Sequence, residues 1–124
     1  IGIGLDVETS GPLSADVLAL VLRPDEQEHV NALEGRLFFS AKEAVYKCVY
    51  PTIRAFIDFK EMHISLDHRR HQFAATPKTA NWPQTLPPLL KGKFMTNRDF
   101  IACAVCIPQC SSVSLPTATE ARIK

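Results

Sequence analysis

The sequence predicts an α+β fold in which an antiparallel sheet packs on helices. Three patterns indicate this class: an alternating segment at the start, a helical period in the middle, and two strand-like segments around a short turn near the end. Strands and helices do not alternate one by one, so a parallel, doubly wound sheet is not expected. The 124 residues are 46% hydrophobic and 22% charged, which suffices for one domain with a buried core.

The first strand is expected over residues 1–8, where apolar residues alternate with glycines and carboxylates. The strand thus has an apolar face and a second face, which carries Gly2, Gly4, Asp6 and Glu8. The two carboxylates project from the same face because their residues are two apart. The glycines leave that face open to the close approach of a ligand or of another backbone.

Two short helices are expected after this strand. Ser14 is a suitable N-cap for the first, and Pro24 is a suitable opening residue for the second, which has an acidic first turn. Gly35 then marks a break.

The strongest helical pattern covers Phe38–Tyr50, and Pro51 is expected to end it. Ser40 and Glu43 have the spacing of a capping box, so Ser40 is the expected N-cap. The expected apolar face of this helix consists of Ala41, Ala44, Val45, Cys48 and Val49.

Four further strands are expected, at Met62–Leu66, Phe73–Ala75, Lys91–Met95 and Phe100–Ile107. The last two flank residues 96–99 and form a plausible hairpin, whereas the proline-rich segment 76–89 is expected to be a loop. We expect one domain over residues 1–108 and a poorly ordered tail over 109–124.

Composition excludes some classes of function. Lys and Arg number 14 and Asp and Glu 13, so a general polyanion binder such as a nucleic-acid-binding domain is not expected. The longest apolar runs, 17–22 and 101–107, are far shorter than the roughly 20 residues of a membrane span. The chain begins at Ile1 rather than Met, so we expect it to derive from a longer or processed protein.

The chain has four cysteines, and their number and spacing favour a reduced, cytoplasmic protein. Cys103 and Cys106 have the C-x-x-C spacing of metal and redox sites. Residues three apart on a strand point to opposite faces, however, so we interpret both as small apolar side chains of a buried strand.

Two pairs of residues are candidates for chemistry. Asp6 and Glu8 repel each other unless a cation lies between them, so they are either ligands of a hard divalent cation or a solvated acidic strand end. Glu43 and Lys47 share a helix face, either as an exposed pair worth about 0.3–0.5 kcal/mol or as a third metal carboxylate beside a phosphate-binding lysine. Spacing alone leaves these alternatives open.

Together and in this order, two motifs resemble the signature of the 4'-phosphopantetheinyl transferase superfamily: Gly4-Leu5-Asp6-Val7-Glu8 and Phe39-Ser40-Ala41-Lys42-Glu43-Ala44-x-x-Lys47. The segments Tyr50-Pro51 and Phe56-x-Asp58-Phe59 resemble the group that includes enterobactin synthase component D and the surfactin-type enzymes. The resemblance covers about residues 1–107.

The resemblance implies Mg²⁺-dependent transfer of 4'-phosphopantetheine from coenzyme A to a serine of an acyl, peptidyl or aryl carrier protein. It implies that Asp6, Glu8 and Glu43 hold the metal, and that Lys47 and Lys42 contact coenzyme A. Glu43 and Lys47 are the implied catalytic residues, with Glu43 as the base for the carrier serine. The pathway implied is bacterial secondary metabolism, such as siderophore or enterobactin biosynthesis, in the cytoplasm.

The resemblance further implies one half of a pseudo-two-fold fold, because both motifs belong to the second half of the enterobactin-type enzymes. Nothing in the chain matches their first half, so we expect a separate first half or self-association to complete the site. The alternative function is a non-catalytic module that binds a carrier protein or coenzyme A. The clustered carboxylates argue against this alternative, and Mg²⁺-dependent coenzyme A binding would discriminate the two.

Overall fold

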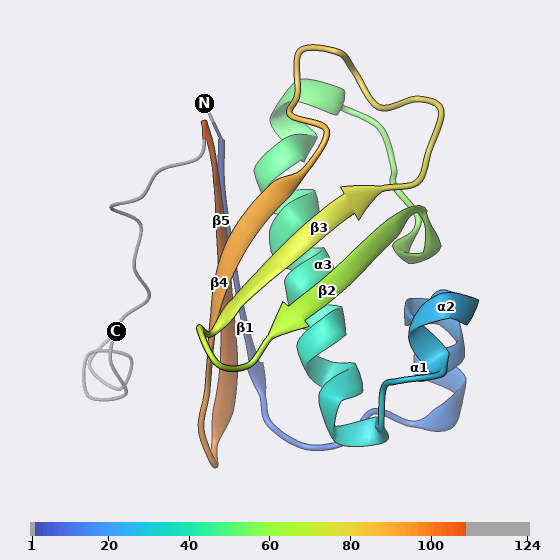
Figure 1. The fold of residues 1–124 in the computed structure, drawn as a ribbon, viewed down its shortest axis with the longest axis vertical. Coiled ribbons are helices and arrows are strands. Elements are labelled where there is room, and N and C mark those ends of the chain that lie inside the picture. Colours follow the sequence, from blue (N-terminus) through green and yellow to red (C-terminus); the bar gives the residue numbers. More distant parts are fainter. Residues whose placement is uncertain (1, 109–124) are drawn as a thin grey trace.

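The computed structural model describes residues 2–108, and the expected tail over 109–124 lies outside the described residues. In chain order the elements are β1 (Gly2–Thr9), α1 (Ala15–Val21), α2 (Pro24–Gln27), α3 (Ala32–Ile53), the 3-10 helix η1 (Phe59–Glu61), β2 (Met62–Asp67), β3 (Gln72–Pro77), β4 (Leu90–Thr96) and β5 (Phe100–Ile107). They form an antiparallel sheet with helices on one face, as Figure 1 shows. The predicted α+β class is therefore confirmed.

The five strands are arranged in the order β1-β5-β4-β3-β2, and every neighbouring pair is antiparallel. The first strand of the chain thus pairs with the last, and β1 forms one edge of the sheet. The long helix α3 packs chiefly on β1 and β5, while α1 and α2 lie on the side of α3 away from these two strands (Figure 1). None of the helices within residues 2–108 has the length and apolar content of a membrane span.

Strand β1 alternates as predicted, but its aliphatic face is the exposed one. Ile3, Leu5 and Val7 are 72%, 50% and 58% exposed, whereas Gly4 and Asp6 on the other face are buried against α3. A Cβ on Gly4 would collide with the carbonyl oxygen of Ala44, so the strand backbone lies directly on the helix backbone. The face of β1 that carries the glycines therefore accommodates the backbone of α3.

Helix α3 begins earlier than predicted. Its N-cap is Asn31, whose side chain accepts a hydrogen bond from the Glu34 amide, and Ser40 lies buried inside the helix. The expected break at Gly35 is wrong, because this glycine lies within the helix where Leu18 of α1 packs against it. The Leu18 side chain therefore packs directly on the helix at this glycine.

Helix α3 also continues past Pro51, so the predicted stop is wrong. Only Thr52 and Ile53 follow the proline before Arg54 ends the helix in the left-handed conformation, with φ of 52°. A proline costs most where a helix continues on both sides, because it removes a backbone donor and crowds the preceding turn. Here it lies within the final turn, where few helical residues remain.

The predicted starts of α1 and α2 are confirmed, whereas β3 continues to Pro77, two residues into the segment 76–89 for which the sequence predicts a loop. The Ser14 hydroxyl accepts a hydrogen bond from the Val17 amide, and Pro24 occupies the first turn of α2. The strands β2 to β5 overlap the four predicted segments, and β4 and β5 form the predicted hairpin. Cys103 pairs with Asp6 and Cys106 pairs with Ile3 across the β1–β5 ladder. The two cysteines therefore lie on opposite faces of the sheet, as predicted. Burial raises the pKa of Cys103 to about 12, as expected for an inert core thiol.

We predict that Gly4→Ala destabilises the fold by about 1–3 kcal/mol or more, because the added methyl group collides with backbone that cannot move aside. Gly35→Ala is the matched control, since its methyl group meets only the end of the Leu18 side chain. Thermal unfolding of both variants tests this, at roughly 4–8 °C for each kcal/mol in a domain of this size. Equal costs for the two substitutions would contradict the role assigned to Gly4.

Candidate functional site

The packing of β1 on α3 brings the two sequence motifs together. The Lys47 Nζ donates hydrogen bonds to the Asp6 Oδ1, 2.9 Å away, and to the Leu5 carbonyl oxygen, 3.2 Å away. Asp6 is almost fully buried, whereas half of the Lys47 side chain is exposed. The site is thus anchored within the protein and opens toward solvent at the lysine.

Asp6 provides a buried oxygen for which the described residues offer no donor other than the neighbouring Glu8 carboxyl in its protonated form. Its Oδ2 is buried without a hydrogen-bond partner, while the Ser40 hydroxyl donates to its backbone carbonyl oxygen over 3.4 Å. Burying a carboxylate oxygen without a partner is costly, and such an atom in a native structure calls for an explanation. A bound cation would supply the missing partner.

Glu8 and Glu43 lie close enough to Asp6 for their charges to interact. Burial raises the pKa of Glu8, Asp6 raises it further, and the Arg36 guanidinium acts in the opposite direction. Burial also raises the pKa of Glu43, as does Asp6, while Lys47 opposes the shift. A raised carboxyl pKa means that the folded state disfavours ionisation. These two groups therefore favour folding at low pH, and this contribution is lost as pH rises through their folded-state pKa values.

Lys47 responds in the complementary way. Its hydrogen bond to Asp6 raises the pKa of the ammonium group, and the charges of Asp6, Glu43 and Glu8 raise it further. Lys47 therefore remains a fixed cation at neutral pH, at the exposed side of a group of carboxylates. This is a suitable place for an anionic ligand that also carries a metal.

The donor chemistry of this site fits Mg²⁺, which prefers carboxylate oxygens. Within residues 2–108, no three acidic, histidine or cysteine side chains are grouped closely enough to hold a metal ion by themselves, and this includes Asp6, Glu8 and Glu43. Mg²⁺ sites in phosphoryl-transfer enzymes commonly use one or two carboxylates, with waters and substrate phosphates completing the shell. The unpartnered Asp6 Oδ2 with Glu8 and Glu43 nearby suits such an open arrangement.

The structure gives Lys42 a different place from the expected contact with coenzyme A. Its ammonium group donates to the Glu26 carboxylate (2.6 Å) and to the carbonyl oxygens of Val21 (2.7 Å) and Phe59 (3.0 Å). A lysine has three donors, so none is left for a phosphate. The side chains of Lys42 and Glu26 are only 2% and 1% exposed, which places this pair in the interior.

Glu26 is the residue that the sequence motifs did not identify. Its carboxylate accepts hydrogen bonds from the Lys42 ammonium group and from the backbone amides of Arg23 and Ile64, each of the latter two with a length of 2.8 Å. It thus ties α2, α3 and the edge strand β2 to one another. Its place at the third position of α2 was the only available signal, since an acidic residue there can cap the helix.

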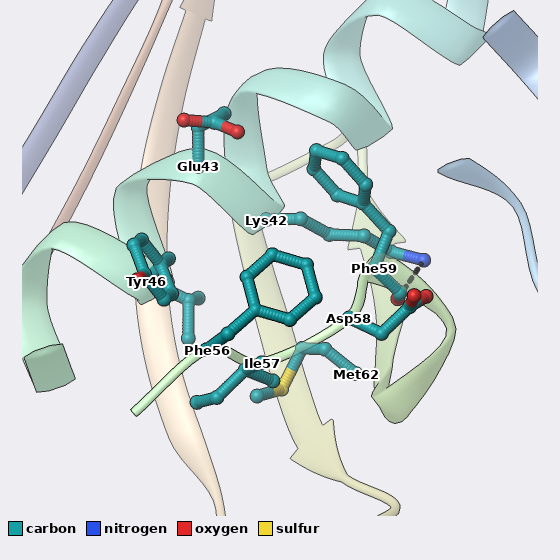
Figure 2. A pocket seen from close by; sticks show the side chains of 9 residues that line it. Lys42, Glu43, Tyr46, Phe56, Ile57, Asp58, Phe59 and Met62 are labelled. Carbon is teal, nitrogen blue, oxygen red and sulfur yellow. Dashed lines mark hydrogen bonds between the residues drawn. The ribbon is translucent and has the colours of Figure 1, made fainter. Parts of the chain in front are cut away.

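An apolar pocket of about 220 Å³ lies beside this pair, between α3 and the segment 56–62 (Figure 2). Its walls come from Lys42, Glu43, Val45, Tyr46, Phe56, Ile57, Asp58, Phe59 and Met62. In Figure 2 the Lys42 side chain extends toward Phe59, whereas the Glu43 carboxylate points away from it. The buried Lys42 therefore fixes one wall of the pocket. Glu43 lies at the edge of the pocket, on the side of Asp6 and Glu8.

Comparison with known proteins gives consistent matches. The family model of the 4'-phosphopantetheinyl transferase superfamily matches residues 2–105. The 4'-phosphopantetheinyl transferase Svp of Streptomyces mobaraensis is 38% identical over 81 residues, which cover 59% of this chain and 33% of that protein. The 4'-phosphopantetheinyl transferase Npt of Nocardia iowensis is 36% identical over 70 residues, covering 52% of this chain and 32% of that protein. The matched part thus spans about a third of each of these relatives.

We predict that Glu26→Gln destabilises the protein by about 3–5 kcal/mol, because it leaves the Lys42 charge buried without its counterion. Urea unfolding measures this loss. The double variant Glu26→Gln with Lys42→Met removes the unpaired charge and keeps an amide oxygen that can accept from a backbone amide, so it should recover part of the loss. A single variant as stable as the wild type would show that the pair does not hold the helices in place.

Proposed function

Because this chain belongs to the 4'-phosphopantetheinyl transferase superfamily, we propose that it carries the catalytic half-site for transfer of 4'-phosphopantetheine from coenzyme A to a carrier-protein serine. The observation that carries this proposal is the meeting of Asp6 and Lys47 beside Glu8 and Glu43, where β1 packs on α3. Clustered carboxylates with an adjacent lysine suit a substrate that brings both phosphate and a divalent cation.

The reaction requires one bond to form and one to break. The serine Oγ bonds to the phosphorus that bears the pantetheine arm, and the anhydride P–O bond breaks, so that adenosine 3',5'-bisphosphate leaves with the electron pair. The serine proton must pass to a base, and we assign this role to Glu43. In the metal-free protein, burial and Asp6 raise the pKa of Glu43, which supports the base role for a Glu43 carboxylate oxygen that does not itself contact the metal.

Asp6, Glu8 and Glu43 are the residues that would hold Mg²⁺. When bound, the ion supplies charge neutralisation on the diphosphate. Lys47 adds a cation on the exposed side of the cluster, where it can contact a phosphate once it turns from Asp6. Lys42 has no part in this proposal, since all its donors are used inside the protein.

The apolar pocket beside Glu43 suits the pantetheine arm of coenzyme A, which is uncharged. Its walls are mainly aromatic and aliphatic, and it lies next to the carboxylates that would hold the diphosphate. A ligand with a charged and an uncharged end would thus lie across the boundary between the two regions. Tyr46 and Phe56, whose ring centroids are 6.4 Å apart, form an aromatic part of this wall.

We further propose that a first half, absent from this chain, covers the exposed face of β1. Ile3, Leu5 and Val7 form an aliphatic row on an edge strand, and exposed apolar rows of this kind usually mark interfaces. The same half would supply cations for the remaining phosphates of coenzyme A. The proposed partners are acyl, peptidyl or aryl carrier proteins of bacterial secondary metabolism, such as siderophore assembly in the cytoplasm. This choice rests on the resemblance of the Phe56-x-Asp58-Phe59 segment to the enterobactin-type group.

We predict that Asp6→Asn and Glu43→Gln each lower phosphopantetheine transfer to an apo carrier protein by about 100-fold or more. Chelation of divalent cations by EDTA should abolish transfer, and added Mg²⁺ should restore it. Glu34→Gln is the control, because Glu34 is a carboxylate of the same helix that pairs with His68 instead. Normal turnover by Glu43→Gln would exclude Glu43 as the base.

We predict that the 124-residue chain alone transfers phosphopantetheine at least about tenfold more slowly than a longer protein that includes the first half. A half-site offers too few contacts to offset the cost of ordering coenzyme A. Transfer assays at equal protein concentration test this, with light scattering to determine the oligomeric state. Full activity from a monomer would contradict the need for a first half, whereas full activity from an oligomer would indicate self-association instead.

A further inference from the structure

Arg36 connects α3 to the turn that follows β1. Its Nε donates a hydrogen bond to the carbonyl oxygen of Gly11, 3.1 Å away, and its Nη2 donates one to the carbonyl oxygen of Pro12, 3.4 Å away. The third nitrogen, Nη1, lies 3.7 Å from the Glu8 Oε1. One guanidinium group thus contacts two backbone oxygens and the Glu8 carboxylate.

We propose that Arg36 is a positioning residue that sets the place of the Glu8 carboxylate in the metal-binding group. This inference rests on the proposed function, because it assumes that Glu8 serves as a ligand. Nothing in the family motifs includes Arg36, which lies one turn of α3 before Ser40.

The position of Glu8 near the end of β1 makes such a residue necessary. Asp6 is held within the strand by the packing of Gly4 on α3, but Glu8 is followed by only one more strand residue before the chain turns. The Ser10 amide donates to the Asp99 carbonyl oxygen and fixes the turn to the β4–β5 connection. Arg36 fixes the same turn from the opposite side, that of the helix.

The geometry favours arginine over lysine at this position. A guanidinium group has five donors in a rigid planar fork, whereas a lysine ammonium is a single point on a flexible stem. Here three different guanidinium nitrogens make the three contacts, the last of them to Glu8, whereas a lysine at this position would have to bring one ammonium nitrogen within reach of all three oxygens. At 3.7 Å the last contact is an ion pair rather than a hydrogen bond, so it orients the carboxylate without occupying the lone pairs that a metal needs.

Positioning and simple charge neutralisation predict opposite effects on metal affinity. If Arg36 only neutralises Glu8, its removal makes the site more negative and strengthens cation binding. If Arg36 positions Glu8, its removal weakens binding, and a lysine in its place does not restore it. Loss of a residue that orients a metal ligand commonly lowers metal affinity by about 10–100-fold.

The experiment measures Mn²⁺ binding by electron paramagnetic resonance in the purified protein, with and without coenzyme A. We expect Arg36→Gln and Arg36→Lys to weaken binding by about tenfold. Arg23→Gln is the matched control, because Arg23 is equally exposed, at 22%, pairs with Asp25 and donates to the Lys60 carbonyl oxygen. It should bind Mn²⁺ like the wild type. Thermal unfolding of all variants shows whether a loss of affinity merely follows a loss of folding.

The outcomes separate this inference from the function on which it rests. Tighter binding in Arg36→Gln, or unchanged binding in Arg36→Lys, would overturn the positioning role while leaving the metal site intact. Equal weakening in Arg23→Gln at equal loss of stability would also overturn it, because the effect would then be one of general stability. A wild-type protein that binds no Mn²⁺ even with coenzyme A would overturn both the metal site and the role of Arg36.

Discussion

Direct contact between the backbone of β1 and that of α3 is the constraint on which the rest of the structure depends. Gly4 lies so close to the helix that a side chain there would meet the Ala44 carbonyl oxygen, and Gly2 meets that of Cys48 in the same way. Two residues further along, the same face carries Asp6 to Lys47. Gly2 and Gly4 thus allow β1 to pack closely on α3, and this packing fixes the distance between Asp6 and Lys47.

This contact also determines which surface of the strand is exposed. Since glycines and carboxylates face the helix, Ile3, Leu5 and Val7 face away from it, and no helix of residues 2–108 covers them. Hydrophobic burial is the usual criterion for orienting a strand, and here it would give the wrong face. An aliphatic row on an open edge of a sheet is the kind of surface that usually forms an interface.

The other side of α3 is held by a buried ion pair. Lys42 and Glu26 are both inside the protein, and together they bind backbone groups of Val21, Phe59 and Ile64. Such pairs add little net stability over apolar residues, but they penalise any arrangement that separates the charges. The pair therefore fixes the relative positions of α2, α3 and β2, and with them the wall of the apolar pocket.

The sequence by itself determined the elements that depend on local chemistry. The Ser14 cap, the opening of α2 at Pro24 and the hairpin of β4 and β5 follow from residues close together in the chain. The resemblance of the sequence to a family, rather than spacing, paired the two motifs that meet at the candidate site. Only the tertiary structure decided that Gly35 lies inside a helix, and that Lys42 is an internal counterion while Lys47 faces solvent. These depend on residues distant in the chain, since a glycine or a lysine has the same local preferences whether a packed helix, a carboxylate or water lies next to it.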